Sequence, residues 1–190
     1  MSVKKIELGE VSGGIVYGIT ISNGVINVNL MNYGATITAI FLPDKNGKLI
    51  NVVARLDSLS EYFNTFGYFG ATVGRMSGRI VNGKFKIGEK EFKTTVNQNG
   101  HTLHGGAQGF DKKVWRIDES ASSENKVVFT YVSSDGEEGF PSKLFVKTIY
   151  TVTEENALRI EYEAETDGET IVGLLNHSYF NLNGDDRGNV

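Results

Sequence analysis

Residues 157–166 read ALRIEYEAET, and this stretch decides the class of fold. Leu158, Ile160, Tyr162 and Ala164 occupy alternate positions, and one Arg and three Glu fill the positions between and after them. Successive side chains of a β-strand point to opposite faces of its sheet. The alternation therefore predicts an antiparallel strand with one buried face and one solvated face.

Outward from this strand, most of the chain shows the same character, since β-branched and aromatic segments are separated by turns that contain Gly or Asn-Gly. Strands are expected over residues 25–31, 33–42, 49–54, 84–87, 91–94, 127–132, 143–152, 157–166 and 170–175. One short helix is expected over residues 58–63, with Ser58 as its N-cap and Glu61 three residues later. Many hairpin turns and almost no helix predict an all-β fold, a β-sandwich or a barrel.

Composition limits the kind of partner. The chain has 190 residues and a formal charge of −4, with 23 Asp and Glu against 19 Lys and Arg, which disfavours nucleic acid and suits a small neutral ligand. The lack of Cys excludes disulfides, thiolate metal sites and a Cys nucleophile. No apolar segment follows the first lysines and no apolar run approaches ~18 residues, so a cytoplasmic protein without membrane contact is expected. No linker or repeat marks an internal boundary within residues 1–190.

A glycine-rich segment, GATVGRMSGRI at residues 70–80, carries Arg75 and Arg79 four positions apart. Glycine lets the backbone approach a ligand closely, and the planar guanidinium of Arg suits paired oxygens. Two surface arginines on a loop are the alternative interpretation. The segment is not a phosphate-binding P-loop, because the Gly-Lys-Ser/Thr ending is missing.

The three histidines fall in two further segments. His101 and His104 lie in NQNGHTLHGG (97–106), and His177 lies in GLLNHSYFNLNG (173–184). A metal site would need at least one more ligand than the His-x-x-His pair, and the neighbouring amides suit hydroxyl groups better, so no metal is expected. A ring bonded to backbone is the alternative role for each histidine. No Ser stands in a Gly-x-Ser-x-Gly elbow that would support a catalytic triad.

Together the three segments resemble the aldose 1-epimerases, also called galactose mutarotases. The resemblance is carried by residues 71–80, 102–106 (TLHGG) and 176–182 (NHSYFNL), and it extends from about residue 12 to the end of the chain. It implies a large antiparallel β-sandwich, the galactose mutarotase-like supersandwich, of which residues 1–190 would form the incomplete, N-terminal part of a single domain. It also implies the interconversion of α and β anomers of free hexoses such as galactose and glucose, without a cofactor.

The resemblance assigns roles to five residues. His177 would be the general acid toward the ring oxygen of the sugar, and His104 would lie beside the reacting centre and help to place the sugar. Arg79 would bind sugar oxygens, and Tyr179 would lie near the sugar. Gly78 stands where many relatives have Asn, so either that contact is lost or the backbone replaces it.

Other candidates are expected to be structural or solvated. His101 and Arg75 have no counterpart in the family pattern. The family's general base is a Glu near the C-terminus of chains of roughly 300 or more residues, well above the usual size of one domain. No Glu here has that context. The remaining carboxylates in turns and near the end are expected to be solvated; they are Glu137, Glu138, Asp185 and Asp186.

Residues 1–190 are therefore expected to be part of a longer enzyme with the acid but not the base, and to aggregate when made alone, through unpaired strand edges and an uncovered apolar face. Two other functions stay open. One is a non-catalytic carbohydrate-binding β-sandwich. The other is a relative of the sugar-phosphate epimerases, for which Arg75 would supply the extra positive charge. The oligomeric state stays open as well.

Overall fold

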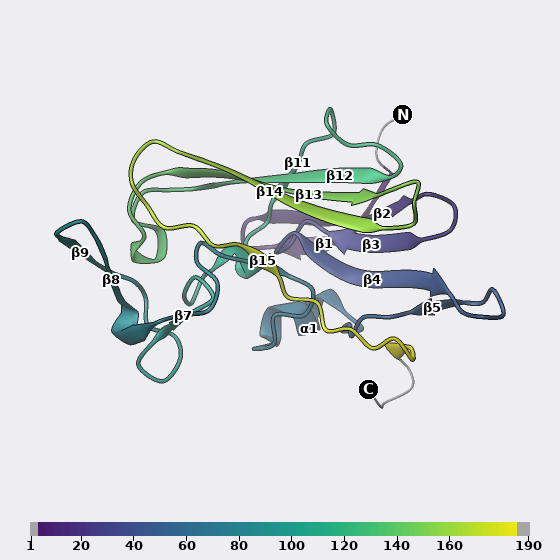
Figure 1. Ribbon diagram of the computed structural model, residues 1–190, viewed down its shortest axis with the longest axis horizontal. Helices are drawn as coiled ribbons and strands as arrows, with labels where there is room; N and C mark the ends of the chain where they lie inside the picture. Colours follow the sequence, from purple (N-terminus) through teal and green to yellow (C-terminus); the bar gives the residue numbers. More distant parts are fainter. Residues whose placement is uncertain (1–3, 186–190) are drawn as a thin grey trace.

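Two antiparallel sheets packed face to face form the body of the molecule (Figure 1). The computed structural model describes residues 4–185. The first sheet has the strand order β1 (Lys5–Val11), β2 (Gly14–Ser22), β3 (Asn27–Met31), β4 (Thr36–Pro43) and β5 (Leu49–Asn51). The second has the order β11 (Arg116–Ile117), β12 (Lys126–Ser133), β13 (Leu144–Val152) and β14 (Leu158–Thr166).

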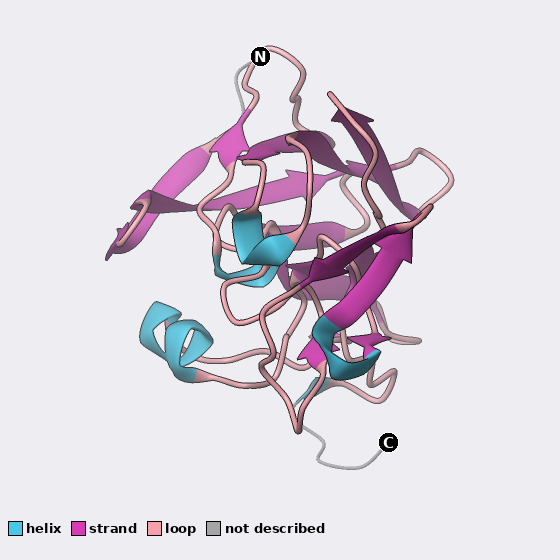
Figure 2. Cartoon of the chain, turned by 90° about the vertical axis from the view of Figure 1, so that its left-hand side faces the viewer, coloured by secondary structure: helices cyan, strands magenta, loops and turns pink. Residues whose placement is uncertain are grey.

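Shorter elements lie outside these sheets, and Figure 2 shows how small the helical share is. They are the helix α1 (Leu59–Asn64), the hairpin of β8 (Lys84–Ile87) and β9 (Lys90–Lys93), and two strand pairs, β7 (Arg79–Ile80) with β10 (Thr102–Leu103) and β6 (Thr72–Val73) with β15 (Leu175–Asn176). Three 3₁₀ turns complete the set: η1 (Val81–Gly83), η2 (Phe110–Lys112) and η3 (Glu137–Gly139). No helix in residues 4–185 is long and apolar enough to cross a membrane.

Side chains from both sheets meet in one core. Ile21 and Val28 come from the first sheet, Phe129 and Tyr150 from the second, and Trp115 packs with them; all five are fully buried. Burying one large apolar side chain contributes about 1.5–3 kcal/mol. The core therefore holds the two sheets against each other.

The strand expected from the alternation at residues 157–166 is confirmed. β14 pairs with β13 along its whole length, from Leu144 opposite Thr166 to Val152 opposite Leu158. Its charged residues are exposed, and Leu158 and Ile160 are half-buried against the core. Ala164 is exposed instead of buried, so the alternation of burial holds only as far as Tyr162.

Other segments differ from expectation. β1 and β2 are not among the expected strands, although β2 carries the β-branched residues typical of a strand. Glycines interrupt its pattern, and β1 is almost wholly exposed; at Gly9 (φ +148°) the register with β2 shifts. The strand expected to begin at residue 33 begins at Thr36, after a turn in which Gly34 and Ala35 have positive φ. The expected helix is confirmed one residue later, with Ser58 as N-cap in a full capping box with Glu61.

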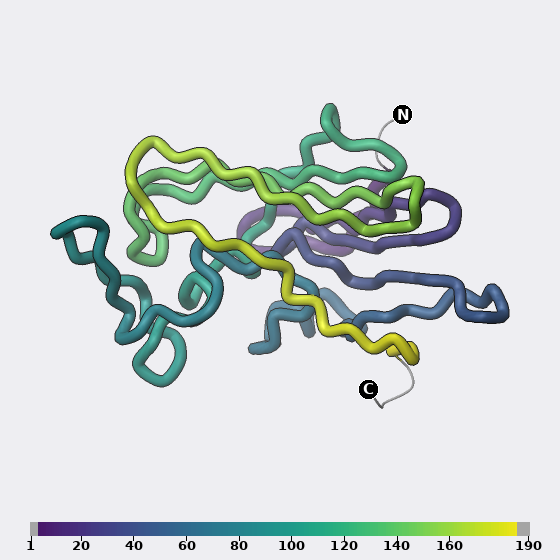
Figure 3. Tube along the Cα trace, viewed as in Figure 1, coloured from purple at the N-terminus to yellow at the C-terminus, as the bar shows by residue number. Residues whose placement is uncertain are grey.

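The strand expected over residues 170–175 is wrong. Only Leu175–Asn176 pairs regularly, with β6. Before it, Gly173 bonds to the carbonyl of Arg75 and the amide of Ser77 in an irregular loop. Figure 3 shows this last part of the chain crossing the molecule, and its end lies along the segment after β5, where Phe180 bridges Val53.

The outer edge of β14 leads to a prediction about association. β14 is nine residues long and has no partner beyond β13 in the described structure. Nearby apolar side chains are exposed, including Val132 (46%) and Phe145 (44%). Because such an edge pairs readily with another chain, we expect the 190-residue chain to self-associate in sedimentation velocity. A monodisperse monomer with one cooperative thermal transition would contradict this.

Candidate active site

Two histidines that lie 73 positions apart in the sequence meet in the structure. The ring centroids of His104 and His177 are 5.2 Å apart, with the rings nearly perpendicular at 88°. The backbone of His177 is held by the glycine-rich segment: its N–H donates to the Ala71 carbonyl (2.8 Å), and its carbonyl accepts from the Gly70 N–H (3.0 Å). The fold thus brings together the two histidines that the sequence singled out.

Gly78 orients His104 through two backbone hydrogen bonds. The His104 N–H donates to the Gly78 carbonyl (2.9 Å), and the Gly78 N–H donates to Nδ1 of His104 (3.1 Å). Because Nδ1 accepts a hydrogen bond, the neutral imidazole carries its hydrogen on Nε2. His104 itself has φ +51°, a left-handed conformation that non-glycine residues adopt mainly where the surroundings impose it. The backbone of Gly78 therefore makes a contact to the site.

Aromatic rings surround the histidine pair. The ring of Tyr68 is 4.7 Å from that of His104 and 5.5 Å from that of His177. Tyr179 lies 5.0 Å from His177, and Phe69 lies 5.1 Å from Tyr179. The sequence interpretation included Tyr179 but missed Tyr68. The signal for Tyr68 was its place two residues before the glycine-rich segment, which carries the candidate arginine.

Arg79 is exposed beside the pair and is close enough to influence the charge state of His104. Its Nε donates to Oε1 of Gln98 (2.9 Å). Its two terminal nitrogens donate to no group in residues 4–185, so they are available to oxygen atoms of a ligand. Gln98 was not named as a candidate, although the amides around it had suggested a site for hydroxyl groups.

Arg75 is not a surface residue, contrary to one interpretation of the segment. It is 1% exposed, and its guanidinium donates to the carbonyls of Pro141 (2.8 Å), Ser142 (2.7 Å) and Ser134 (3.0 Å). It also donates to the hydroxyl of Ser133. All of these acceptors belong to β12 and the segment that follows it, so the role of Arg75 is structural.

Glu137 belongs to the same buried cluster as Arg75. Its carboxylate accepts from Tyr131 (2.6 Å) and from Ser133, and it pairs with Lys113 (2.8 Å). Burial alone would raise the pKa of Glu137, but the hydrogen bonds from Lys113, Ser133 and Tyr131 outweigh it and hold the pKa below the usual range.

The other carboxylates and His101 also have partners. Glu138 accepts from the Ala107 N–H (2.8 Å), and Asp185 pairs with Arg55 (3.2 Å). The expectation of a solvated carboxylate is therefore wrong for Glu137, which has three partners in a buried cluster. Glu138 and Asp185 are half-buried, and each also has a protein partner. Asp186 lies outside the described residues. The ring of His101 accepts from the Asn82 N–H (3.0 Å), a bond to backbone of the kind expected for a structural histidine.

The fold and the motifs together define the class of protein: an all-β, galactose mutarotase-like fold in which two sheets support loops that carry paired histidines. The solved structures it resembles include an aldose epimerase homologue from C. elegans, with a TM-score of 0.83 and 32% identity over 88% of this chain and 51% of that one. A galactose 1-epimerase from Lactobacillus acidophilus superposes with a TM-score of 0.82 at 28% identity, over 96% of this chain and 54% of that one.

The sequence comparisons identify the family. The family model described as aldose 1-epimerase matches residues 17–190, and the chain belongs to this family. Galactose mutarotase of Mus musculus is 40% identical over 192 residues, which is all of this chain and 55% of that protein. Aldose 1-epimerase of Haemophilus influenzae is 39% identical over 90% of this chain and 49% of its own length. The chain thus spans about half the length of these relatives.

Substitutions at Gly78 test its backbone role. Gly78 has φ +77°, and a Cβ placed on it would meet no atom within 4 Å. Asn tolerates this conformation and β-branched residues do not, so we expect Gly78→Asn to lower the free energy of unfolding by less than about 1 kcal/mol and Gly78→Val by about 1–3 kcal/mol. Urea denaturation measures both, and equal losses would contradict the assignment.

The pH dependence of stability tests the environment of His104. Burial lowers the pKa of His104, and the nearby positive charges of His177 and Arg79 lower it further. As pH falls, the unfolded chain therefore takes up a proton at this residue before the folded chain does. The stabilising contribution is complete above about pH 6.5 and is lost as pH falls toward the folded-state pKa.

We therefore expect the melting temperature to fall between pH 7 and pH 5, and this fall to be smaller in His104→Gln. NMR titration of the imidazole C–H signals gives the pKa directly. A His104 pKa above the usual range would contradict the assignment.

Proposed function

We propose that this chain supplies the hexose-binding and acid part of an aldose 1-epimerase that interconverts the α and β anomers of free hexoses such as galactose and glucose. The observation that carries the proposal is the contact between His104 and His177, with Arg79 and an aromatic wall beside them. We also propose that residues 1–190 belong to one β-sandwich domain, since one core joins both sheets.

The reaction needs an acid and a base on the two sides of the anomeric centre. A base takes the proton of the anomeric hydroxyl while an acid protonates the ring oxygen, and the bond between C1 and that oxygen breaks. Rotation about the C1–C2 bond and reclosure then give the other anomer. No electrons and no groups are transferred, so the chemistry requires no cofactor.

In this proposal His177 gives its proton to the ring oxygen, because an imidazole can hold and return a proton near neutral pH. His104, with its hydrogen on Nε2, donates a hydrogen bond that places the sugar. The terminal nitrogens of Arg79 bind hydroxyl oxygens, and Tyr179 borders the ring. Gly78 contributes through its backbone, by orienting His104.

The base is the part of the mechanism that the described residues do not provide. Among residues 4–185, no carboxylate forms a hydrogen bond or ion pair with either imidazole. Burial raises the pKa of Tyr68, and the carboxylate of Asp111 raises it further. The proposal assigns the base to a glutamate in the later part of the family's chains. The 190 residues of this chain do not cover that part of its relatives.

The same observation favours one second candidate, a non-catalytic carbohydrate-binding β-sandwich. Such a protein would keep Arg79, His104 and the aromatic wall and would need no base. A sugar-phosphate substrate has less support, because Arg75, the cation that would hold the phosphate, is buried and bonded to backbone carbonyls.

Polarimetry on freshly dissolved α-D-glucose and α-D-galactose separates the two candidates. With the full gene product, in which the later part of the family's chains supplies the base, we expect the optical rotation to decay faster than in the buffer blank. A decay equal to the blank would overturn the enzymatic proposal. Sugar-induced shifts of the His104 and His177 signals in NMR, observed without faster decay, would establish the binding protein instead.

A further inference from the structure

One residue, Glu138, holds both ends of the loop that carries His104, residues 95–107. The Thr95 N–H donates to the backbone carbonyl of Glu138 (2.9 Å), and the Ala107 N–H donates to Oε2 of the Glu138 side chain (2.8 Å). Glu138 lies 31 positions after Ala107, in the turn η3. The bond from Thr95 does not require a particular side chain at position 138, so only the Ala107 end of the loop depends on the carboxylate.

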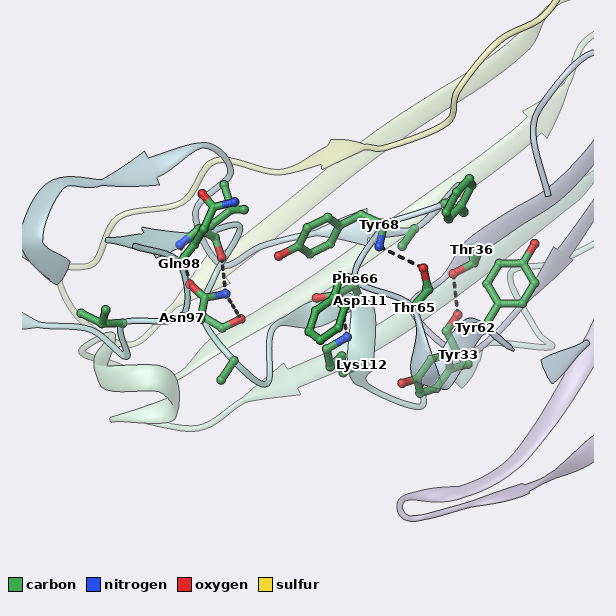
Figure 4. A pocket seen from close by; sticks show the side chains of 17 residues that line it. Tyr33, Thr36, Tyr62, Thr65, Phe66, Tyr68, Asn97, Gln98, Asp111 and Lys112 are labelled. Carbon is green, nitrogen blue, oxygen red and sulfur yellow. Dashed lines mark hydrogen bonds and ion pairs between the residues drawn. The ribbon is translucent and has the colours of Figure 1, made fainter. Parts of the chain in front are cut away.

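The interior of this loop is shaped by its own contacts. Asn97, which lines the pocket drawn in Figure 4, donates through Nδ2 to the carbonyls of Leu103 (3.1 Å) and Gly106 (3.0 Å). Its Oδ1 accepts from the Leu103 N–H (2.7 Å). These bonds join parts of the same loop, so the position of His104 in the site must be set by contacts with other segments.

The glycine-rich segment supplies these contacts on one side of the loop. β10 pairs with β7, and Gly78 donates to Nδ1 of His104. A Cβ on Gly105 would collide with the carbonyl oxygen of Gly74, and a Cβ on Gly106 would collide with Oε2 of Glu138. The two residues after His104 therefore lie between the glycine-rich segment and the Glu138 carboxylate, where only glycine fits without a rearrangement.

The segment that carries Glu138 is itself tied to the glycine-rich segment. Arg75 donates to the carbonyls of Pro141 (2.8 Å) and Ser142 (2.7 Å), so each of the three segments is joined to the other two. Glu138 has φ +50° and His104 has φ +51°. Residues other than glycine keep this left-handed conformation only where the surroundings impose it, and such residues cluster at active sites.

We propose that Glu138 is a positioning residue: its carboxylate holds the Ala107 end of the loop and thereby keeps His104 where Gly78 fixes the imidazole hydrogen on Nε2. The inference rests on the proposed function, because His104 must place the sugar. Glu138 acts through the loop backbone and not as an acid or a base. A carboxylate suits this role, since a charged acceptor forms a stronger bond to a backbone N–H than a neutral one does.

Two conservative variants separate reach from charge. Glu138→Asp keeps the charge and tolerates positive φ, but its side chain is one methylene too short for the Ala107 N–H. Glu138→Gln loses the charge and keeps an acceptor oxygen at the same distance. Long-range ¹H–¹⁵N NMR of the 190-residue chain, at a pH where the imidazole is neutral, reports which nitrogen carries the hydrogen. We expect His104 to keep the Nε2–H form in Glu138→Gln and to populate both tautomers in Glu138→Asp.

The dissociation constant of galactose, measured by NMR titration of the same samples, gives the second readout. We expect binding to weaken about tenfold in Glu138→Asp, which corresponds to about 1.4 kcal/mol, and to change less than about twofold in Glu138→Gln. Glu89→Asp is the matched control: Glu89 is exposed in the turn between β8 and β9, and the same shortening there should change neither readout.

A Glu138→Asp variant that melts at a lower temperature but keeps the wild-type tautomer of His104 would overturn the positioning role and leave Glu138 as a stabilising residue. Unchanged galactose binding in Glu138→Asp would overturn it as well, while binding by the wild type would leave the proposed function intact. Failure of galactose to bind to the wild type would overturn the proposed function, and the tautomer of His104 would still decide whether Glu138 positions it.

Discussion

Replacement of Arg75 by Met is expected to lower the free energy of unfolding by about 3–5 kcal/mol, the usual cost of removing one partner from a buried charged cluster. The guanidinium satisfies the carbonyls of Ser134, Pro141 and Ser142, and Met would leave these acceptors without a donor. It would also leave Glu137 near the core with one positive charge fewer. Met fills a similar volume, so lost packing would not explain the result.

Arg79→Met is the matched control, because Arg79 lies in the same segment but is exposed. A surface substitution of this kind usually changes stability by less than about 0.5 kcal/mol. Arg75→Lys should fall between the two, since Lys keeps the charge but lacks the planar fork. Urea denaturation followed by the fluorescence of Trp115, the single and fully buried tryptophan, measures all three. Equal effects at Arg75 and Arg79 would contradict the structural role.

The contrast between these two arginines shows where sequence reasoning stops. Each of them directly follows a Gly in one short segment, and nothing in the local sequence distinguishes the buried arginine from the exposed one. What buries Arg75 is the segment after β12, which folds over it and presents carbonyl oxygens from more than 55 positions away. Likewise, the turn around Glu137 predicts a solvated carboxylate, whereas the fold brings Lys113 and Tyr131 into contact with it.

Local patterns succeeded where a segment carries its own information. The alternation at residues 157–166 identified β14, and the Ser58–Glu61 spacing identified the cap of α1. The pattern failed where neighbouring segments decide the outcome, as in β1, which has no buried face of its own to alternate. In the candidate site, motif order singled out His104 and His177, whereas Tyr68 and Gln98 gained their place only from the fold.

In the full gene product, which supplies the base, replacement of His177 by Asn is expected to remove nearly all mutarotation, a loss of about 10²–10⁴-fold, which is the usual contribution of a general acid. Asn is close to His in size and can still donate a hydrogen bond, but it cannot transfer a proton. The half-buried position of His177 and its backbone bonds to Gly70 and Ala71 do not depend on the ring. The melting temperature should therefore stay close to that of the wild type while the rate, measured by polarimetry, falls.

Variants of the other two histidines test whether the loss of activity is specific to the general acid. His101→Asn is the control and should leave the rate unchanged, since the ring of His101 bonds only to the Asn82 backbone. Burial, His177 and Arg79 all hold the pKa of His104 down, so at neutral pH His104 is a neutral hydrogen-bond donor and a poor source of protons. His104→Gln, which keeps an N–H donor, should therefore weaken sugar binding more than it slows the bound sugar's reaction. A His177→Asn variant that works at the wild-type rate would contradict the assignment of the acid to His177. A His104→Gln variant that loses nearly all activity while His177→Asn keeps it would show that His104 is the acid.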